Sequence, residues 1–268
     1  MLASIEEWGA EHAAAGAVAA GGVAATHGSE EHVFRWASVT KLLTATAVLV
    51  AAEEGILDLD EAAGPPGSSV RHLLAHASGL PFEGDEPIAR PGRRRIYSNA
   101  GYEELGRVVA DRAGMPFAEY LGAAVFRPLA MARSRLDGSP GSEGRGPLAD
   151  LLRFAQELLA PSLVAAETIA EATSVQFPGL VGVIPGLGRY EPNDWGLGFE
   201  LRDGKSPHWT GSRNSPRTFG HFGGAGTFLW VDPDAGVGCV CLTDREFGDW
   251  ALAAWPMLSD GVLEEVGS

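Results

Sequence analysis

Hydrophobic and polar positions follow three different patterns along the chain. Residues 2–14 predict a helix, and the glycine-punctuated apolar runs at 17–20, 23–26 and 32–36 predict two or three short antiparallel strands. Over residues 38–55 the apolar residues recur at helical spacing, and Gly55 is suited to end that helix. The N-terminal part is therefore expected to place short strands directly before a long helix.

The rest of the chain divides into a helical part and a second β part. Between about residues 60 and 178, helices are expected at 70–75, 103–113, 116–125, 148–159 and 164–172, with prolines in the loops between them. After Trp195, strands are expected at 196–201, 218–222, 227–231 and 236–242, followed by a closing helix at 247–265.

This order of elements predicts an α+β fold. The two β segments can join into one antiparallel sheet flanked by the terminal helices, which would form a domain from residues 1–59 and 179–268. Residues 60–178 would form an inserted all-helical lobe. A ligand site is expected in the cleft between the sheet and this lobe.

Composition narrows the possible partners. Of the 268 residues, 45% are hydrophobic and 21% charged, as in an ordinary globular protein, and the net charge is −15. Such an acidic surface argues against binding to nucleic acid or to anionic membranes. No apolar stretch reaches the length of a membrane span, and the first eleven residues contain glutamates but no lysine or arginine. A cytoplasmic protein is therefore expected.

The only two cysteines, Cys239 and Cys241, lie two residues apart in a predicted strand. Their side chains should point to the same face, where neighbouring positions rarely reach disulfide geometry. We expect two small, unpaired core residues in a reducing compartment.

Ser38 and Lys41 are the first candidate catalytic residues. They lie one helical turn apart at the start of the predicted helix, so the lysine amine can reach the serine hydroxyl. A serine becomes a nucleophile when a base removes its proton, and a lysine serves as that base when burial keeps it neutral. The chain has only two lysines among its basic residues, and arginine would stay protonated. The alternative is a capping serine followed by a surface lysine.

Two further segments carry candidate chemistry. Tyr97 could relay a proton beside a lysine and Asn99 could orient the lysine and a substrate carbonyl, unless Asn99 merely caps the following helix. His221 opens a glycine-rich run on a predicted edge strand, where the Gly224 backbone N–H could join that of Ser38 in an oxyanion hole. The alternative for this run is a simple glycine-rich turn.

The order S-x-x-K at 38–41, Y-x-N at 97–99 and H-x-G at 221–223 resembles the three-motif signature of the serine β-lactamase-like superfamily. The likeness is greatest to the branch of class C β-lactamases, D-alanyl-D-alanine carboxypeptidases, D-aminopeptidases and related carboxylesterases. The stretches "HLLAHASGLP" from His72 and "HFGGAGTFLWVDPDAGVGCVCLTDR" from His221 are also similar to this family, and the resemblance covers roughly the whole chain.

The resemblance implies a β-lactamase/transpeptidase-like fold and an acyl-enzyme mechanism. Ser38 would be the nucleophile with Lys41 and Tyr97 as catalytic partners, and the N–H groups of Ser38 and Gly224 would hold the oxyanion. Asn99, His221 and Gly223 would bind the substrate, a small ester, amide or β-lactam. No metal or other cofactor is expected.

Some residues depart from the pattern of efficient β-lactamases. His221 stands where many have a lysine, and Phe222 stands where a hydroxyl residue often helps to hold the substrate carboxylate. These changes favour an esterase-like hydrolase. A β-lactamase, a D-amino-acid peptidase, an acyl-binding sensor and an acyltransferase remain alternatives. The arginines at 93–95 could attract an anionic substrate or simply form a solvated loop.

Overall fold

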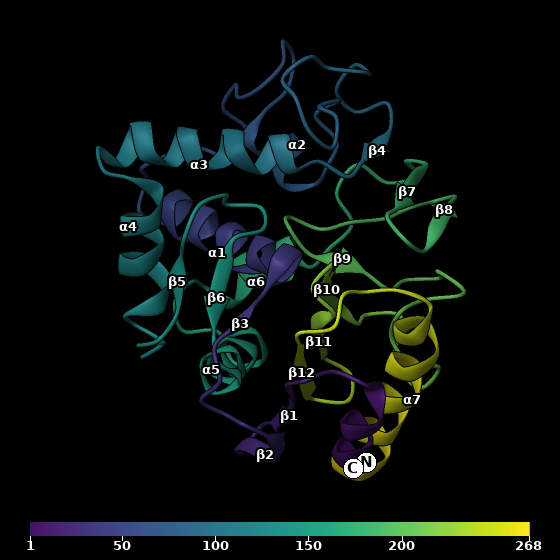
Figure 1. Cartoon of the computed structure of the whole chain (residues 1–268). Helices are drawn as coiled ribbons and strands as arrows, with labels where there is room; N and C mark the ends of the chain where they lie inside the picture. Colours follow the sequence, from purple (N-terminus) through teal and green to yellow (C-terminus); the bar gives the residue numbers. More distant parts are fainter. Residues whose placement is uncertain (268) are drawn as a thin grey trace.

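The computed structural model describes residues 1–267, and its centre is a six-stranded antiparallel sheet (Figure 1). The strands lie in the order β2 (Gly22–Gly28), β1 (Ala13–Ala19), β12 (Val237–Thr243), β11 (Thr227–Asp232), β10 (Phe219–Gly223) and β9 (Glu200–Leu201). The two ends of the chain meet where β1 pairs with β12, with Ala15 opposite Cys241. The predicted joining of the two β segments into one sheet is confirmed.

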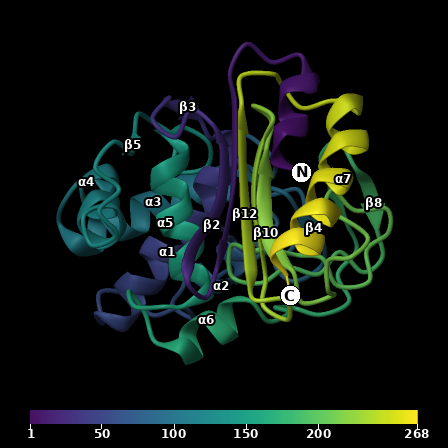
Figure 2. The ribbon, with the colours of Figure 1, turned by 90° about the horizontal axis from the view of Figure 1, so that it is seen from below.

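The sheet has a helical layer on each face, which Figure 2 shows edge on. Along β12, Val240 and Leu242 pack with one hydrophobic cluster, together with α5 (Leu148–Leu159), while Cys239 and Cys241 pack with the other. The second face is covered by the 3-10 helix η1 (Leu2–Trp8) and by α7 (Asp249–Val266). The expectation of two unpaired cysteines on one buried face is confirmed.

Helix α1 (Thr40–Glu53) runs through the middle of the helical part of the molecule. Every residue from Thr40 to Ala51 is buried, which fits a sequence that is apolar on all sides of the helix. Gly55 follows its end with a φ of 70°, a left-handed conformation that suits glycine. The remaining helices of this part are α2 (Val70–Leu74), α3 (Asn99–Ala113), α4 (Phe117–Leu121), the π-helical turn η3 (Gly122–Phe126) and α6 (Ala166–Ala172).

Two small sheets were not expected from the pattern, although β3 (Phe34–Arg35) lies within the strand expected at 32–36. One consists of β3, β6 (Gly144–Gly146) and β5 (Arg135–Leu136), and the other of β4 (Arg95–Ile96), β7 (Gly182–Ile184) and β8 (Gly188–Tyr190). Strands of two or three residues are too short to show alternation in a sequence. Segment 60–178 thus contains short strands among its helices, and its separation as a lobe stays a prediction.

The predicted helix at residues 2–14 is wrong in its second half. The 3-10 helix ends at Trp8, Gly9 follows with a φ of 65°, and β1 begins at Ala13. Alanine favours helix in isolation, but Ala14 and Ala15 lie between β2 and β12 and are completely buried there. Tertiary pairing has overridden the local preference.

Candidate active site

Ser38 and Lys41 are adjacent at the N-terminal end of α1. Ser38 lies in a one-turn 3-10 helix, η2 (Ala37–Val39), and Lys41 lies in the first turn of α1. The lysine is completely buried, and its Nζ is 3.4 Å from Ser38 Oγ. Ala37, directly before the serine, has a φ of 46°, a left-handed conformation that is uncommon for a residue with a side chain. The nucleophile candidate therefore follows a locally strained turn.

Gly223 lets strand β10 approach this turn closely. A Cβ at Gly223 would lie 2.4 Å from the Trp36 carbonyl oxygen and 3.1 Å from Ala37 Cβ, so a larger residue would push the two segments apart. Gly223 does not line the pocket beside Ser38, whereas Gly224 does. The structure thus gives Gly223 a packing role, and the substrate contact expected from its motif stays a prediction.

The amine of Lys41 is held by two acceptors from distant segments. It donates to Asn99 Oδ1 at 2.6 Å and to the Gly141 carbonyl at 2.8 Å. It also lies 4.7 Å from the centre of the Tyr97 ring and 5.2 Å from that of Tyr102. Gly141 was not among the predicted site residues, because a backbone carbonyl in a polar linker leaves no signal in a sequence.

These surroundings favour a neutral lysine. Burial lowers the pKa of Lys41 from 10.5 to about 7, although the charge of Glu103 opposes part of this change. A neutral amine has two N–H groups and one lone pair. Because Asn99 and Gly141 accept the two N–H groups, the lone pair remains for the hydroxyl proton of Ser38.

Tyr97 and His221 form a second pair beside Ser38. The Tyr97 hydroxyl lies 3.3 Å from His221 Nε2, and His221 Nδ1 lies 2.6 Å from the Phe222 carbonyl oxygen. A carbonyl only accepts, so Nδ1 carries the proton and Nε2 accepts from the tyrosine. Burial, with the nearby Lys41, lowers the pKa of His221 to about 3, and burial raises the pKa of Tyr97 above its ordinary value. Both rings are therefore neutral at pH 7.

His76 holds the backbone on both sides of Tyr97. The Ile96 N–H donates to the His76 carbonyl at 2.9 Å, and the Ser98 N–H donates to His76 Nδ1 at 3.1 Å. The His76 and Tyr97 rings lie 4.7 Å apart. Sequence reasoning quoted His76 only as part of a family-like stretch, and this buried clamp is a functional candidate that it missed.

Helix α3 begins inside the Tyr97 segment. The Ser98 hydroxyl accepts a hydrogen bond from the Gly101 N–H at 2.9 Å, so the serine caps the helix. Asn99 is the first helical residue, and its side chain reaches Lys41 instead. The alternative in which Asn99 serves as the cap is thereby excluded.

A pocket of about 230 Å³ opens beside Ser38. Its polar side chains are those of Ser38, Tyr97, Glu200 and His221. Its walls are mostly apolar, formed by Phe82, Ile184, Pro185, Trp195, Phe222 and Phe247. Within β10, strand β9 pairs with Phe219 and Gly220 but not with His221, so the part of β10 that carries His221 extends beyond β9 toward this pocket.

Glu200 is a buried carboxylate that sequence reasoning did not identify. Its Oε1 lies 2.9 Å from Lys205 Nζ, and its Oε2 accepts hydrogen bonds from His208 at 2.9 Å and from Trp209 at 2.8 Å. Burial opposes ionisation of Glu200, but the charges of Lys205 and His208 outweigh it and lower the pKa to about 2. His208 and Trp209 thus hold Glu200 and do not line the pocket themselves.

The three consecutive arginines have different positions. Arg95 is buried and donates to the backbone carbonyls of Ala75, Gln176 and Asn193. Arg93 and Arg94 are exposed and line a groove whose lining also includes Tyr97. Arg95 is therefore structural, and only its two neighbours are available to a ligand.

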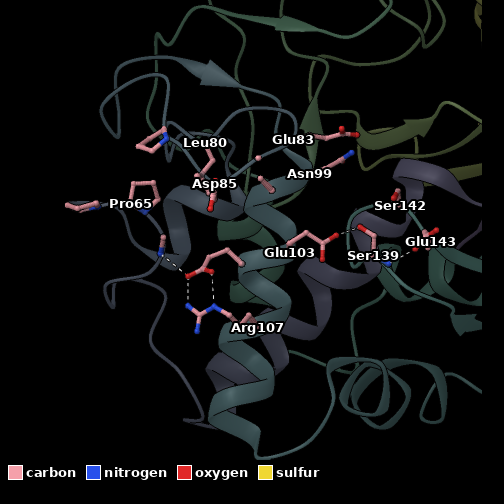
Figure 3. Close-up of a pocket in the computed structure, with 16 residues that line it drawn as sticks. Pro65, Leu80, Glu83, Asp85, Asn99, Glu103, Arg107, Ser139, Ser142 and Glu143 are labelled. Atoms are coloured by element: carbon pink, nitrogen blue, oxygen red, sulfur yellow. Dashed lines mark hydrogen bonds and ion pairs between the residues drawn. The ribbon is translucent and has the colours of Figure 1, made fainter.

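A separate groove of about 880 Å³ begins at Asn99 (Figure 3). Its rim is rich in carboxylates, with Glu83, Asp85, Glu103 and Glu143 among its lining residues. Glu103 accepts a hydrogen bond from the Ser139 hydroxyl across this groove. This acidic groove adjoins the lysine side of the site.

Among the described residues, the cluster able to offer three metal ligands lies outside the pocket lining. Glu11, His12 and Asp244 bring their ligand atoms within 4.8 Å of one another, and all three are exposed. The Asp244 carboxylate already accepts the backbone N–H groups of Glu11 and His12. The pocket around Ser38 itself offers one carboxylate and one histidine, which is too few for a closed metal site.

The fold is that of the β-lactamase type of serine hydrolase, and it brings Ser38, the buried Lys41 and Tyr97 close together. The sequence profile of the Beta-lactamase family matches residues 7–259. The chain belongs to this family.

Relatives and solved structures agree with that assignment. A beta-lactamase from Mycobacterium bovis is 54% identical, with a TM-score of 0.98 over 100% of this chain and 99% of that one. "D-alanyl-D-alanine-carboxypeptidase/endopeptidase AmpH" of Escherichia coli K12 is 22% identical, over 88% of this chain and 76% of its own length. "Penicillin-binding protein 4*" of Bacillus subtilis is 28% identical over 39% of this chain, and the match spans only 30% of that protein. None of the helices in residues 1–267 is long and apolar enough to cross a membrane.

Proposed function

We propose that the protein is a serine acyl hydrolase that forms an acyl-enzyme on Ser38 and acts on small esters or amides. The observation that carries this proposal is the buried Lys41 amine, 3.4 Å from Ser38 Oγ, with a pKa lowered to about 7. A base with a pKa near the working pH combines a useful neutral fraction with sufficient basicity. A cytoplasmic location stays a prediction.

In acylation, the lone pair of Lys41 takes the proton of the Ser38 hydroxyl as Oγ bonds to the substrate carbonyl carbon. The backbone N–H groups of Ser38 and Gly224 are the donors we assign to the resulting oxyanion. As the carbonyl re-forms, the bond to the leaving group breaks. Tyr97 gives its proton to the leaving oxygen or nitrogen and takes one from the Lys41 ammonium, which restores the neutral amine.

Deacylation repeats these steps with water. The neutral Lys41, with Tyr97 as relay, takes a proton from the water molecule whose oxygen attacks the ester carbonyl. The bond to Ser38 Oγ then breaks, and the serine recovers a proton from the same relay. Between these steps the neutral His221 accepts the hydrogen bond of Tyr97 and so holds the phenol oxygen beside Ser38. When a proton is transferred, the O–H group turns away from His221 Nε2 toward the leaving group or Ser38 Oγ.

The pocket lining supports an ester-like substrate. A volume of about 230 Å³ with aromatic walls suits a short apolar acyl group. With its pKa lowered to about 3, His221 carries no positive charge for a β-lactam carboxylate, and Phe222 offers no hydroxyl. Both features favour neutral esters over penicillins at this pocket.

β-Lactam hydrolysis is the second candidate. It is supported by the Mycobacterium bovis structure, which is 54% identical and is described as a beta-lactamase. The same Ser38 chemistry would open the lactam ring. The two candidates therefore differ in substrate preference and share one mechanism.

Hydrolysis of p-nitrophenyl butyrate and of nitrocefin would test the proposal. We expect turnover of the butyrate ester to fall about a thousandfold in Ser38→Ala and about a hundredfold in Tyr97→Phe, with Ser4→Ala as an exposed control. Intact-mass analysis with a fluorophosphonate should show one adduct on the wild type and none on Ser38→Ala. Unchanged turnover in Ser38→Ala would refute covalent catalysis at this residue, and the ester-to-lactam ratio decides between the two candidates.

A further inference from the structure

A second large groove opens from the catalytic pocket on the tyrosine side. It has a volume of about 870 Å³ and shares Phe82, Tyr97 and Pro185 with the lining of the pocket beside Ser38. The groove and the pocket therefore adjoin at these three side chains. We call it the arginine groove, after Arg93, Arg94 and Arg189 in its lining.

The charges of the arginine groove are available to a ligand. Arg93 and Arg94 are exposed, and within residues 1–267 neither forms an ion pair. Arg189 pairs with Glu191 at 3.0 Å, but both side chains are about two-thirds exposed. Unneutralised guanidinium groups stand out on a chain with a net charge of −15.

The two grooves beside the site have opposite charge. The groove at Asn99 is lined by Glu83, Asp85, Glu103 and Glu143 (Figure 3), together with Glu104 and Arg107, which pair with each other. The arginine groove has four arginines in its lining, the buried Arg95 among them, and no carboxylate. An anionic substrate is repelled from the first and attracted to the second. The charges therefore favour one orientation of such a substrate at Ser38, with its anionic end toward the arginine groove.

Apolar side chains accompany these arginines. Phe82, Ile88 and Val183 line the arginine groove and are 48%, 68% and 53% exposed, which is unusual for large hydrophobic residues. Such a surface suits a ligand with a hydrocarbon segment and a charged end. The planar guanidinium group recognises a carboxylate through paired N–H donors.

We propose that the arginine groove binds a carboxylate carried on an apolar segment of the substrate, and so makes the enzyme selective for anionic esters or amides. This inference rests on the proposed hydrolase function, because it assigns the substrate class of the same site. The carboxylate is placed at Arg93 and Arg94, away from His221. Selectivity would come from attraction at the rim, while the uncharged reacting group remains at Ser38.

The kinetic test compares esters that differ in one carboxylate. p-Nitrophenyl hemiadipate carries it on the acyl side, and the butyryl ester of 5-hydroxy-2-nitrobenzoate carries it on the leaving group. p-Nitrophenyl hexanoate and butyrate are their neutral partners. We expect one anionic ester to exceed its neutral partner in kcat/KM about three- to tenfold at low salt, and the advantage to shrink at high salt.

The matched variants locate the effect. Arg93→Gln/Arg94→Gln should remove the preference and leave the neutral esters unchanged. Arg90→Gln is the control, since Arg90 is exposed in the same loop but does not line the groove. The proposal would be overturned if the wild type showed no preference for an anionic ester, or if the double variant kept that preference. Turnover of the neutral esters would still support the hydrolase function in either case.

Binding supplies a measurement that does not depend on turnover. On the Ser38→Ala protein, calorimetry would compare adipic acid mono-4-nitroanilide with hexanoic acid 4-nitroanilide, and 5-butyramido-2-nitrobenzoate with butyric acid 4-nitroanilide. We expect the carboxylate ligand of one pair to bind about three- to tenfold more tightly than its neutral partner, and the double arginine substitution to abolish that difference. Equal affinities in both pairs, or no binding of either carboxylate ligand, would refute the groove's role even if the protein proved not to be a hydrolase.

Discussion

The lowered pKa of Lys41 predicts the pH dependence of the reaction. If the neutral amine is the base, kcat/KM for a neutral ester follows the neutral fraction, which is half at pH about 7. The rate should therefore rise about tenfold between pH 5 and 6 and level off above pH 8. With an unperturbed pKa of 10.5, the rise would continue through pH 10 instead.

Glu103 provides the matched perturbation. Its charge raises the pKa of Lys41, so Glu103→Gln should move the midpoint of the pH profile to lower pH by a few tenths of a unit, given that Glu103 is exposed. The glutamine can still accept the hydrogen bond of Ser139. Glu104→Gln is the control, because Glu104 pairs with Arg107 and does not act on Lys41.

The measurement is a stopped-flow or steady-state profile of p-nitrophenyl butyrate hydrolysis from about pH 5 to 9 for the three proteins. Lys41→Arg should lose activity about a thousandfold at every pH, because a guanidinium stays protonated. A midpoint near 10, or equal shifts in the Glu103 and Glu104 variants, would show that the base is not the buried Lys41 amine.

Three further changes test other parts of the site. Lys41→Met should raise the free energy of unfolding at pH 7 by about 1 to 3 kcal/mol in chemical denaturation, because the charged form of the buried lysine disfavours folding. A lysine whose pKa is lower in the folded state destabilises the protein most below about pH 7 and not at all above pH 10.5. The stabilisation by methionine should therefore become smaller as the pH rises from 7 to 10.5. His76→Leu should lower kcat about tenfold with little change in KM, whereas His76→Asn keeps an acceptor for the Ser98 N–H and should keep most of the activity. If the two variants lost the same activity and had the same melting temperature, His76 would not act by holding the backbone at Ser98. Phe222→Thr should raise nitrocefin turnover relative to butyrate, and an unchanged ratio would remove Phe222 from the account of specificity.

The pattern of apolar positions predicted the long elements and the short helices α2 and α6, but it missed most of the two- and three-residue strands. The four longest helices and the strands β10 to β12 lie within a few residues of their expected places, since each has a buried face that its sequence must match. The helix expected through residue 14 failed because β1 is rich in alanine, whose preference says little once two strands flank it. Two-residue strands such as β4 depend on partners far along the chain, which no local pattern contains.

The residues of the candidate site also differ in how far the sequence could predict them. Side-chain types with a chemical role, such as Ser38, Lys41 and Tyr97, were visible in the sequence because their spacing and order are characteristic. The groups that set the properties of those side chains were not visible. Gly141 contributes only a carbonyl, and His76 acts largely through its backbone and one ring nitrogen.

This division has a physical cause that bears on function. The motif S-x-x-K fixes the distance between Ser38 and Lys41, but the same spacing on an exposed helix would leave the lysine protonated and inert. Its pKa is lowered only because segments 97–102 and 139–141 cover the amine and supply two neutral acceptors for its N–H groups. The covering that makes Lys41 a base also costs stability in its charged form. Reactivity in this fold is therefore a property of the loops that cover the first turn of α1, and substitutions there should change the pH profile before they change substrate binding.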